Sequence, residues 1–302
     1  MAENKIYVDG TDLWDLGVVL APNSYKSVLQ WAQLKSVKTN DWAEYDYIEP
    51  DLESPTLEKR NVTLNFHAQG LSGYETFITY LKEHSLQTWN FADLGIILSL
   101  RIDSNSLSHI SPKWQSFSVS FVDDAPYSPQ YNVIDCSEYG GGGIDFDNYE
   151  CAFFGITILT DTLKTIRQIG KIKERLLIQQ QATDGAWYDN NGIKQVSSTD
   201  FTVRCLMRAK NVATLINNYF GFLRFLIRPN VRNVFVGDTM EILECYYKSS
   251  TCNEFCKRLS SGAVGIAFDI TFTLTGKGLL RLIASDSMEQ TLVSDDGVYL
   301  IP

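Results

Sequence analysis

Alternating apolar and polar residues recur in short runs along this chain, a period of two that is typical of half-buried β-strands. In one run, Val62, Leu64 and Phe66 fall on the same face. The same reasoning predicts strands at 6–8, 17–20, 59–68, 95–102, 114–122, 174–181, 201–208, 234–236, 241–247 and 263–275. The pattern therefore predicts a mainly β protein.

Apolar residues spaced three and four apart interrupt these strands and predict amphipathic helices. Residues 74–84 and 211–226 each follow a long strand, and each predicts a helix. The stretch 161–172 predicts a further helix, which we interpret as an addition to the second half of the chain. The stretch 25–37 is compatible with either a helix or a strand.

The predicted elements occur twice in the same order. Residues 6–10 are followed seven positions later by 17–20, and residues 144–148 are followed seven positions later by 155–158. Further matches are 41–46 with 184–189, Val62-Leu64-Phe66 with Val203-Cys205-Met207, Tyr74-Ile78-Leu81 with Leu215-Tyr219-Phe222, and Phe117-Val119-Phe121 with Phe268-Ile270-Phe272. The repeat predicts a β-sandwich or barrel with a flanking α-helix, present in two tandem copies.

The repeat divides the chain into four segments. We expect a first β domain at 1–125, a linker at 126–143, a second β domain at 144–276 and a C-terminal arm at 277–302. Four consecutive glycines at 140–143 end the linker. Because glycine loses the most entropy on ordering, we interpret them as a hinge. The arm alternates weakly and is expected to pair with a neighbouring subunit.

Composition favours a folded chain without a membrane segment. The 302 residues are 44% apolar, with no run of 18 apolar residues and no N-terminal signal segment. All six cysteines lie in the second half, where Cys151 and Cys205 stand at apolar positions of the repeat, as buried reduced thiols do. We therefore expect folding in a reducing cytoplasm and no contact with a membrane.

The net charge of −10 at pH 7 bears on the partners of the protein. Wrapping nucleic acid requires clustered Lys and Arg that contact phosphates, so the excess of Asp and Glu argues against it. An acidic surface is compatible with nucleic acid that slides past without binding, because it repels phosphate. Solubility alone also explains an acidic chain.

No arrangement of residues in the sequence predicts catalysis or a cofactor. Three isolated histidines are present: His67, His84 and His109. None of them stands in a nucleophile motif. Cys245, Cys252 and Cys256 are close together, but their spacing is not that of a zinc site. We therefore expect no enzyme activity, no cofactor and no metal.

Four aromatic residues stand at turn-like positions: Trp42, Tyr45, Trp187 and Tyr188. Exposed aromatic side chains anchor many subunit interfaces, so these four are candidate interface residues. The alternative is a stacking platform for carbohydrate, in a pair of carbohydrate-binding or adhesin-type modules.

The order of elements resembles the opening of the distal tail proteins of long-tailed bacteriophages. The resemblance is carried by a strand that ends in Asp9-Gly10-Thr11-Asp12-Leu13, the strand Gly17-Val18-Val19, a turn near Asp41, and the strand at 59–66 with the helix that follows it. It covers residues 5–124 and, more faintly, 144–275.

This resemblance implies the tail-tube fold, a β-sandwich or barrel flanked by a helix, assembled as a ring around the channel that DNA crosses. Two fused units would close such a ring as a trimer with pseudo-sixfold symmetry, and a hexamer is the alternative. The resemblance further implies contacts with other tail proteins, passage of DNA without specific binding, and a place in the virion tail after assembly in the bacterial cytoplasm. A distal tail protein usually carries one tube unit, so distal tail, tube and hub proteins are all compatible with the chain.

Overall fold

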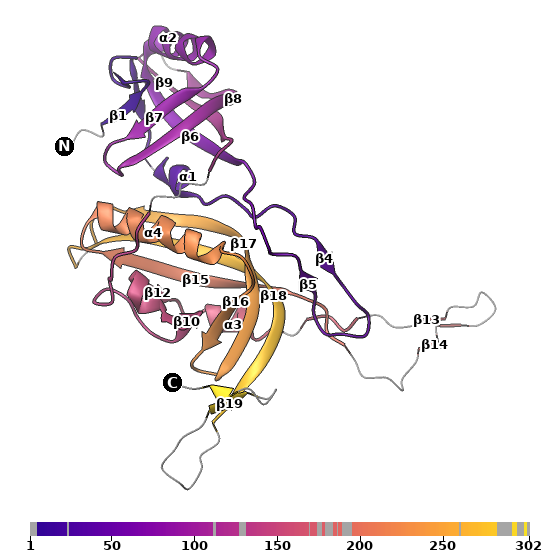
Figure 1. The fold of residues 1–302 in the computed structure, drawn as a ribbon. Helices are drawn as coiled ribbons and strands as arrows, with labels where there is room; N and C mark the ends of the chain where they lie inside the picture. Colours follow the sequence, from indigo (N-terminus) through magenta and orange to yellow (C-terminus); the bar gives the residue numbers. More distant parts are fainter. Residues whose placement is uncertain are drawn as a thin grey trace.

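The computed structural model contains two curled antiparallel β-sheets, one from each half of the chain (Figure 1). It describes residues 5–22, 24–110, 113–126, 131–168, 170–173, 177–178, 184–185, 187–188, 195–259, 261–282, 292–294 and 299–300. The protein is mainly β, as the alternating pattern predicts.

The first sheet has seven strands in the order β2-β1-β7-β8-β9-β6-β3. These are β1 (Ile6–Val8), β2 (Thr11–Asp12), β3 (Val18–Leu20), β6 (Arg60–Gln69), β7 (Gln87–Phe91), β8 (Ile96–Ile110) and β9 (Trp114–Asp123). Helix α2 (Gly70–Glu83) follows β6. Between β3 and β6 lie helix α1 (Tyr25–Leu29) and a separate hairpin of β4 (Thr39–Asn40) and β5 (Glu49–Pro50).

The second sheet has the strand order β11-β10-β16-β17-β18-β15-β12, and β19 and β20 extend it from β18. Its strands are β10 (Ile144–Phe146), β11 (Tyr149–Glu150), β12 (Ile156–Ile158), β15 (Asp200–Ala209), β16 (Arg232–Val236), β17 (Glu241–Cys256), β18 (Val264–Leu282), β19 (Leu292–Ser294) and β20 (Tyr299–Leu300). A 3₁₀ turn, η1 (Cys151–Phe154), precedes β12, and helix α4 (Val212–Leu226) follows β15. Between β12 and β15 lie helix α3 (Thr162–Ile166) and the hairpin of β13 (Leu177–Ile178) and β14 (Trp187–Tyr188).

Strand β6 shows how the sequence pattern forms the core. Val62, Leu64 and Phe66 are fully buried, and the residues between them point to the other face. The buried face is covered by α2, whose Phe77 ring lies 5.1 Å from the ring of Phe66. In the second sheet, Asn211 starts the covering helix by accepting a hydrogen bond from the backbone N–H of Thr214 at 2.9 Å.

The two sheets have the same strand order, and they repeat each other in detail. Asp9 and Asp147 both adopt the left-handed conformation, with φ of 49° and 47°. The Asp9 carboxylate accepts a hydrogen bond from the backbone N–H of Thr88 at 2.7 Å, and that of Asp147 accepts one from Asn233 at 2.8 Å. Two copies of one fold are therefore joined in this chain.

Strand pairing corrects part of the sequence alignment between the copies. Phe66 lies opposite Phe117 on β9, and Cys205 lies opposite Phe268 on β18. Cys205 is therefore the counterpart of Phe66, and not of Leu64 as the match of the two alternating runs predicted. A shift of two residues keeps every side chain on its own face, so the pattern alone could not detect the error.

The helix predicted at 161–172 is wrong in length and in its interpretation as an addition. Of the described residues in this stretch, only Thr162–Ile166 are helical, and α1 occupies the matching place in the first half. A 138-residue offset also relates the hairpin pair Thr39↔Pro50 to Leu177↔Tyr188. The match of 41–46 with 184–189 is therefore wrong, because Trp187 corresponds to Glu49. The predicted strand at 174–181 lies largely outside the described residues.

Several strands differ from their predicted lengths. The sequence pattern predicted no strand at the position of β7, whose Trp89 and Phe91 are fully buried. Strands β8 and β17 continue to Ile110 and Cys256, well beyond the predicted ends at 102 and 247. Both extensions are mostly polar and contain β-bulges, which interrupt the alternation of faces on which the predictions depended.

The hinge interpretation of the four glycines is wrong, because the described part of the linker is packed on the second sheet. A Cβ atom at Gly140 would lie 2.3 Å from Cα of Ala152. The backbone N–H of Gly141 donates to the Ile156 carbonyl at 3.0 Å, and that of Ile134 donates to the Asn218 side chain at 2.8 Å. The first of these glycines therefore permits a close backbone approach.

The described part of the C-terminal segment pairs within its own chain. Strand β18 continues without a break from Val264 to Leu282, across the expected boundary at 276. Leu280 then lies opposite Ser294 of β19, which pairs in turn with β20. Pairing of this segment with a neighbouring subunit stays a prediction.

Candidate assembly interface

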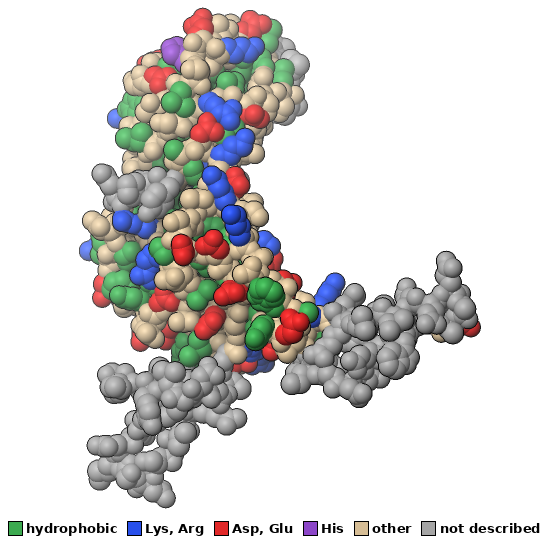
Figure 2. Space-filling model, turned by 45° about the vertical axis from the view of Figure 1, so that its right-hand side comes forward, with side chains coloured by type: hydrophobic (Ala, Val, Ile, Leu, Met, Phe, Trp, Pro, Cys, Tyr) green, Lys and Arg blue, Asp and Glu red, His purple; other side chains and the backbone are tan. Residues whose placement is uncertain are grey.

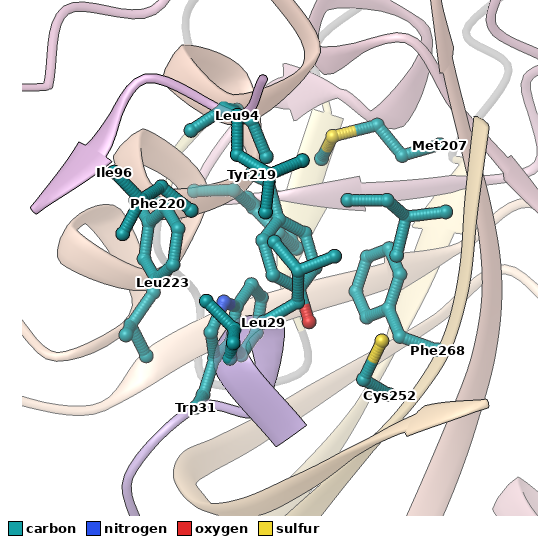
Figure 3. Close-up of a cluster of buried hydrophobic side chains, with 14 of the residues drawn as sticks. Leu29, Trp31, Leu94, Ile96, Met207, Tyr219, Phe220, Leu223, Cys252 and Phe268 are labelled. Atoms are coloured by element: carbon teal, nitrogen blue, oxygen red, sulfur yellow. The ribbon is translucent and has the colours of Figure 1, made fainter. Parts of the chain in front are cut away.

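The two units are joined by residues 28–33, which begin at the end of α1 and which we call the first strap. Trp31 of this strap is 2% exposed and lies inside the second unit (Figure 3). Its ring centroid is 4.6 Å from that of Tyr219 on α4 and 5.3 Å from that of Phe268 on β18. The cores of the two units are therefore continuous through the strap.

A buried ion pair holds the strap to the first unit. Nε of Arg60 lies 2.8 Å from a carboxylate oxygen of Asp123, and both side chains are about 5% exposed. The same guanidinium donates to the backbone carbonyl oxygens of Val28 at 2.9 Å and Gln30 at 2.5 Å. Because a buried guanidinium needs several acceptors, Arg60 fixes the path of the strap as well as pairing with Asp123.

The strap also forms hydrogen bonds with β17 of the second unit. The side-chain amide of Gln30 accepts from the backbone N–H of Cys252 at 2.9 Å and donates to the Ser250 carbonyl. The phenol of Tyr247 donates to the Ala32 carbonyl at 2.7 Å. These bonds continue as far as position 34, whose backbone N–H donates to the Lys248 carbonyl at 2.9 Å. The interface therefore combines a buried aromatic anchor with directional polar contacts.

Residues 34–57, which we call the first arm, extend from the strap along the second unit (Figure 1). The arm is closed at its base by the bridge Leu34↔Leu57 and contains the β4–β5 hairpin. Residues 172–196, the second arm, are closed by the matching bridge Ile172↔Val196 and contain the β13–β14 hairpin. Each unit therefore carries a hairpin and a matching bridge at its base.

The tip of the first arm contacts the base of the second. The Lys173 ammonium is 8% exposed and lies 2.5 Å from the Asp41 carboxylate. It also donates to the carbonyl oxygens of Trp42 and Tyr47, both at 2.7 Å. The carboxylate of Asp46 accepts from the backbone N–H of Val196 at 2.6 Å. The two arms are thus linked where the second one begins.

The predicted interface aromatics lie on these arms. Trp42 and Tyr45, in the loop of the first arm, are 55% and 70% exposed. Trp187 and Tyr188 form β14 of the second arm, and their side chains lie outside the described residues. The sequence therefore indicated the arms but missed Trp31, the aromatic residue that joins the units. Trp31 falls in the stretch 25–37, where the sequence did not distinguish a helix from a strand.

Parts of the first unit and of the linker cover α4 from outside. Leu94 and Ile96, at the turn between β7 and β8, lie beside Phe220 and Leu223 in the same buried cluster (Figure 3). Tyr131 of the linker stacks on Phe220 with ring centroids 5.0 Å apart. Because α4 is covered on both sides, its buried residues run from Leu215 to Leu226 and are mostly apolar.

Burial raises the pKa values of two titratable groups in the interface. Burial raises the pKa of the Cys252 thiol to about 12, and it raises the pKa of the Tyr219 phenol well above its usual value. Both groups are therefore neutral at pH 7. They act here as packing groups and carry no charge.

The described residues contain no group of three His, Cys, Asp or Glu placed to hold a metal ion. His67 contacts the Ser116 hydroxyl at 2.9 Å, and His84 contacts the Tyr80 carbonyl at 3.0 Å. The side chain of His109 lies outside the described residues. Of the three clustered cysteines, Cys245 and Cys252 are buried and Cys256 is partly exposed. Among the described helices, none has both the length and the apolar character needed to cross a bilayer.

An open cleft of about 750 Å³ lies where the base of the first arm, the end of β9, the linker and the end of α4 meet. Two ion pairs flank it: Asp124 with Arg101 at 2.7 Å, and Arg228 with Asp147 at 3.0 Å. On the face that Figure 2 shows, acidic and basic side chains are interspersed, so the negative net charge is not gathered there.

Comparisons with known proteins found few similarities. No family model matches the chain, and no curated protein matches it. One similar solved structure is the crystal structure of the SPP1 Dit (gp 19.1) protein, described as a paradigm of the hub adsorption apparatus in phages that infect Gram-positive bacteria. The match covers 90% of this chain and 98% of that one, at 11% sequence identity and a TM-score of 0.32. A superposition this loose assigns neither a fold nor a role.

Proposed function

We propose that this chain is a structural subunit of a bacteriophage or prophage-derived tail. In this role it forms a ring around the DNA channel, as a distal tail, tube or hub protein. The observation that carries the proposal is the tandem repeat of one sheet-and-helix unit, in which the strap and arm of the first copy are docked on the second. The resemblance of the sequence to distal tail proteins supports the same role.

A repeated unit with the same docking element in each copy suits ring assembly. Each sheet ends in short strands, β2 and β3 in the first and β11 and β12 in the second. Exposed sheet edges pair readily with other chains, and a closed cyclic assembly is one way to cover them. Two units in each chain would give a trimer pseudo-sixfold symmetry, whereas a hexamer would contain twice as many units.

In this role the protein has no catalytic function, and DNA passes through the ring without specific binding. The net charge of −10 supports this part of the proposal, because a negative chain offers phosphates few favourable contacts. Other tail proteins would bind the two open ends of the ring. The proposed location is the virion tail.

The alternative is a carbohydrate-binding or adhesin-type pair of modules. Its support is the exposure of Trp42 and Tyr45 on the first arm. The alternative predicts saturable glycan binding that Trp42→Ala abolishes while Trp31→Phe, inside the core, leaves it intact. A glycan array that shows no binding by the wild-type protein would remove this alternative.

The test of the proposed function has two measurements. Light scattering after size exclusion, together with negative-stain images, should show closed rings of the purified protein. Immunogold labelling should then place the protein on the tails of particles that carry its gene. A protein that stays monomeric at tens of micromolar and is absent from such particles would overturn the proposal.

A further inference from the structure

We infer that the face of the first unit formed by α2 and β8 binds the segment that follows α3 in the second unit of a neighbouring copy of the chain. This inference rests on the proposed function, because it specifies the contact through which a ring would form. The contact would repeat, between chains, the one that the first strap makes within each chain.

The two receiving faces correspond residue by residue. Tyr74 on α2 lies 4.9 Å from Phe117 at an interplanar angle of 78°, and Tyr219 on α4 lies 5.1 Å from Phe268 at 84°. The bulges correspond as well. One bulge in β8 follows Ile102 and one in β17 follows Tyr247, at the same offset of 145 residues. Position 105 of β8 is therefore the counterpart of position 250 of β17, and 107 is the counterpart of 252.

The same positions differ in burial between the two faces. Leu71 on α2 is 51% exposed, whereas its counterpart Ile216 on α4 is 3% exposed. Tyr74 is half-buried, whereas Tyr219 is completely buried. On the strands, Asn105 is exposed and Ser250 is 7% exposed. The first strap, the linker and the β7–β8 turn cover the second face, and a single chain leaves the matching positions of the first face open.

The sequence of the second unit contains a matching strap. Residues 166–171, which we call the second strap, begin at the end of α3 as the first strap begins at the end of α1, at the offset of 138 residues that relates the two hairpins. Gln168 stands at the position of Gln30, and Ile169 at the position of Trp31. An amide and a large apolar side chain are therefore adjacent in both straps. The placement of Ile169 lies outside the described residues.

Two described residues close to Ile169 in the sequence are exposed. Gln168 is exposed, whereas Gln30 bonds both Ser250 and Cys252 of β17. Ile172, at the base of the second arm, is 49% exposed. A neighbouring copy offers Gln168 the backbone groups of Asn105 and Leu107 on β8. Exposed apolar side chains are therefore present on both proposed surfaces, at Ile172 and at Leu71.

A second copy of the chain is the occupant that these features favour. Within one chain the first strap is docked, whereas Gln168 of the second strap and Leu71 of the first face are both exposed. One head-to-tail contact between copies covers both at once. Because such a contact joins two different surfaces, its repetition gives a closed ring or an open filament, depending on the rotation between copies.

The test uses disulfide crosslinking of the full-length chain in a Cys256→Ser background, which removes the partly exposed thiol. Gln30→Cys in that background provides the internal control, because the Gln30 side chain already accepts from the backbone N–H of Cys252 and the new thiol should form a crosslink with Cys252 within one chain. The test variant combines Gln168→Cys with Leu107→Cys, the equivalent pair between chains. Leu107→Cys introduces the residue that the second unit already has at this position.

The double variant should give a ladder of covalent multimers on a non-reducing gel, which collapses on reduction. Either cysteine alone should give no ladder. If the wild-type protein forms rings and the double variant shows no ladder, the inference is overturned and the proposed function stands. If the ladder forms but the protein is absent from virions, the contact is correct and the proposed function fails.

A second variant tests the receiving face without new thiols. Leu71→Asp places a charge on the open face of α2. It should raise at least tenfold the protein concentration below which the assembly dissociates into monomers. Leu86→Asp is the matched control, because Leu86 is similarly exposed, at 56%, and lies beyond the end of α2. Equal dissociation of both variants, or of neither, would contradict the assignment of the face.

Discussion

The indole of Trp31 lies 4.6 Å from the phenol ring of Tyr219, although the two residues belong to different units of the chain. Trp31 is carried by the first strap, and Tyr219 lies on the helix that covers the second sheet. The strap thus completes the hydrophobic core of a unit to which it does not belong. This contact makes the two tandem copies unequal, because only the second one is covered in a single chain.

Trp31→Ala should destabilise the protein by about 3–5 kcal/mol, the usual cost of truncating a large buried aromatic residue. Urea unfolding followed by circular dichroism would measure the loss. We also expect two separate transitions, because the variant weakens the contact that couples the units. Trp42→Ala, at a side chain that is 55% exposed, is the matched control and should change stability by less than about 0.5 kcal/mol. Similar losses in both variants would contradict the anchoring role of Trp31.

Asp123→Asn should destabilise the fold by about 3–5 kcal/mol, because it leaves the buried guanidinium of Arg60 without its charged partner. Thermal unfolding would show the change. The double variant Arg60→Met/Asp123→Leu should recover part of this loss, since it removes the uncompensated charge. It should not recover all of it, because Arg60 also binds the strap carbonyls of Val28 and Gln30. Complete recovery would show that the strap does not depend on Arg60.

Asp145→Asn should stabilise the protein at pH 7. Burial, together with Glu150 directly opposite on β11, raises the pKa of the Asp145 carboxyl above its ordinary value. The folded state therefore holds the carboxyl proton of Asp145 more tightly than the unfolded state does. The contribution of Asp145 to stability falls as the pH rises from the pKa of the unfolded state through the higher pKa of the folded state. Removing the charge should recover up to about 1 kcal/mol, a typical size for a cross-strand pair.

The control for Asp145 is a carboxyl group whose pKa is shifted in the opposite direction. A hydrogen bond from Arg101 lowers the pKa of Asp124, so its contribution is present at neutral pH and is lost as the pH falls. Asp124→Asn should therefore lower the urea midpoint at pH 7, where Asp145→Asn raises it. Changes of the same sign in both variants would contradict this account of the two sites.

Cys256 should be the first thiol of the native protein to react with a disulfide reagent, since the other five cysteines are buried. The reaction should be slow at pH 8, because partial burial and Glu254 raise the pKa of the Cys256 thiol. Glu254→Gln replaces the carboxylate that accepts from the Cys256 thiol at 3.5 Å by a neutral amide, and the loss of negative charge should speed the reaction. Mass spectrometry of the first labelled product would identify the residue. Initial labelling of Cys136 or Cys252 would contradict the expected order.

By itself the sequence determined the class of the fold and its repetition. Alternation at Phe117, Val119 and Phe121 and again at Phe268, Ile270 and Phe272 specifies one buried face on each of two corresponding strands, whatever the tertiary structure around them. Such local patterns are strong because each side chain on a strand points to one of two faces. An alignment of two strands that is shifted by two residues keeps the same alternation of faces. For this reason the pattern aligned Cys205 with Leu64 and not with Phe66.

The tertiary structure alone decided how the copies meet. Nothing near Trp31 in the sequence distinguishes a tryptophan that fills its own core from one that fills the core of the next unit, because the partners, Tyr219 and Phe268, are almost 200 residues away or more. The linker glycines suggested a hinge, and only the close approach of Ala152 to Gly140 showed a packed segment. Long-range contacts depend on the path of the whole chain, and local composition does not record that path.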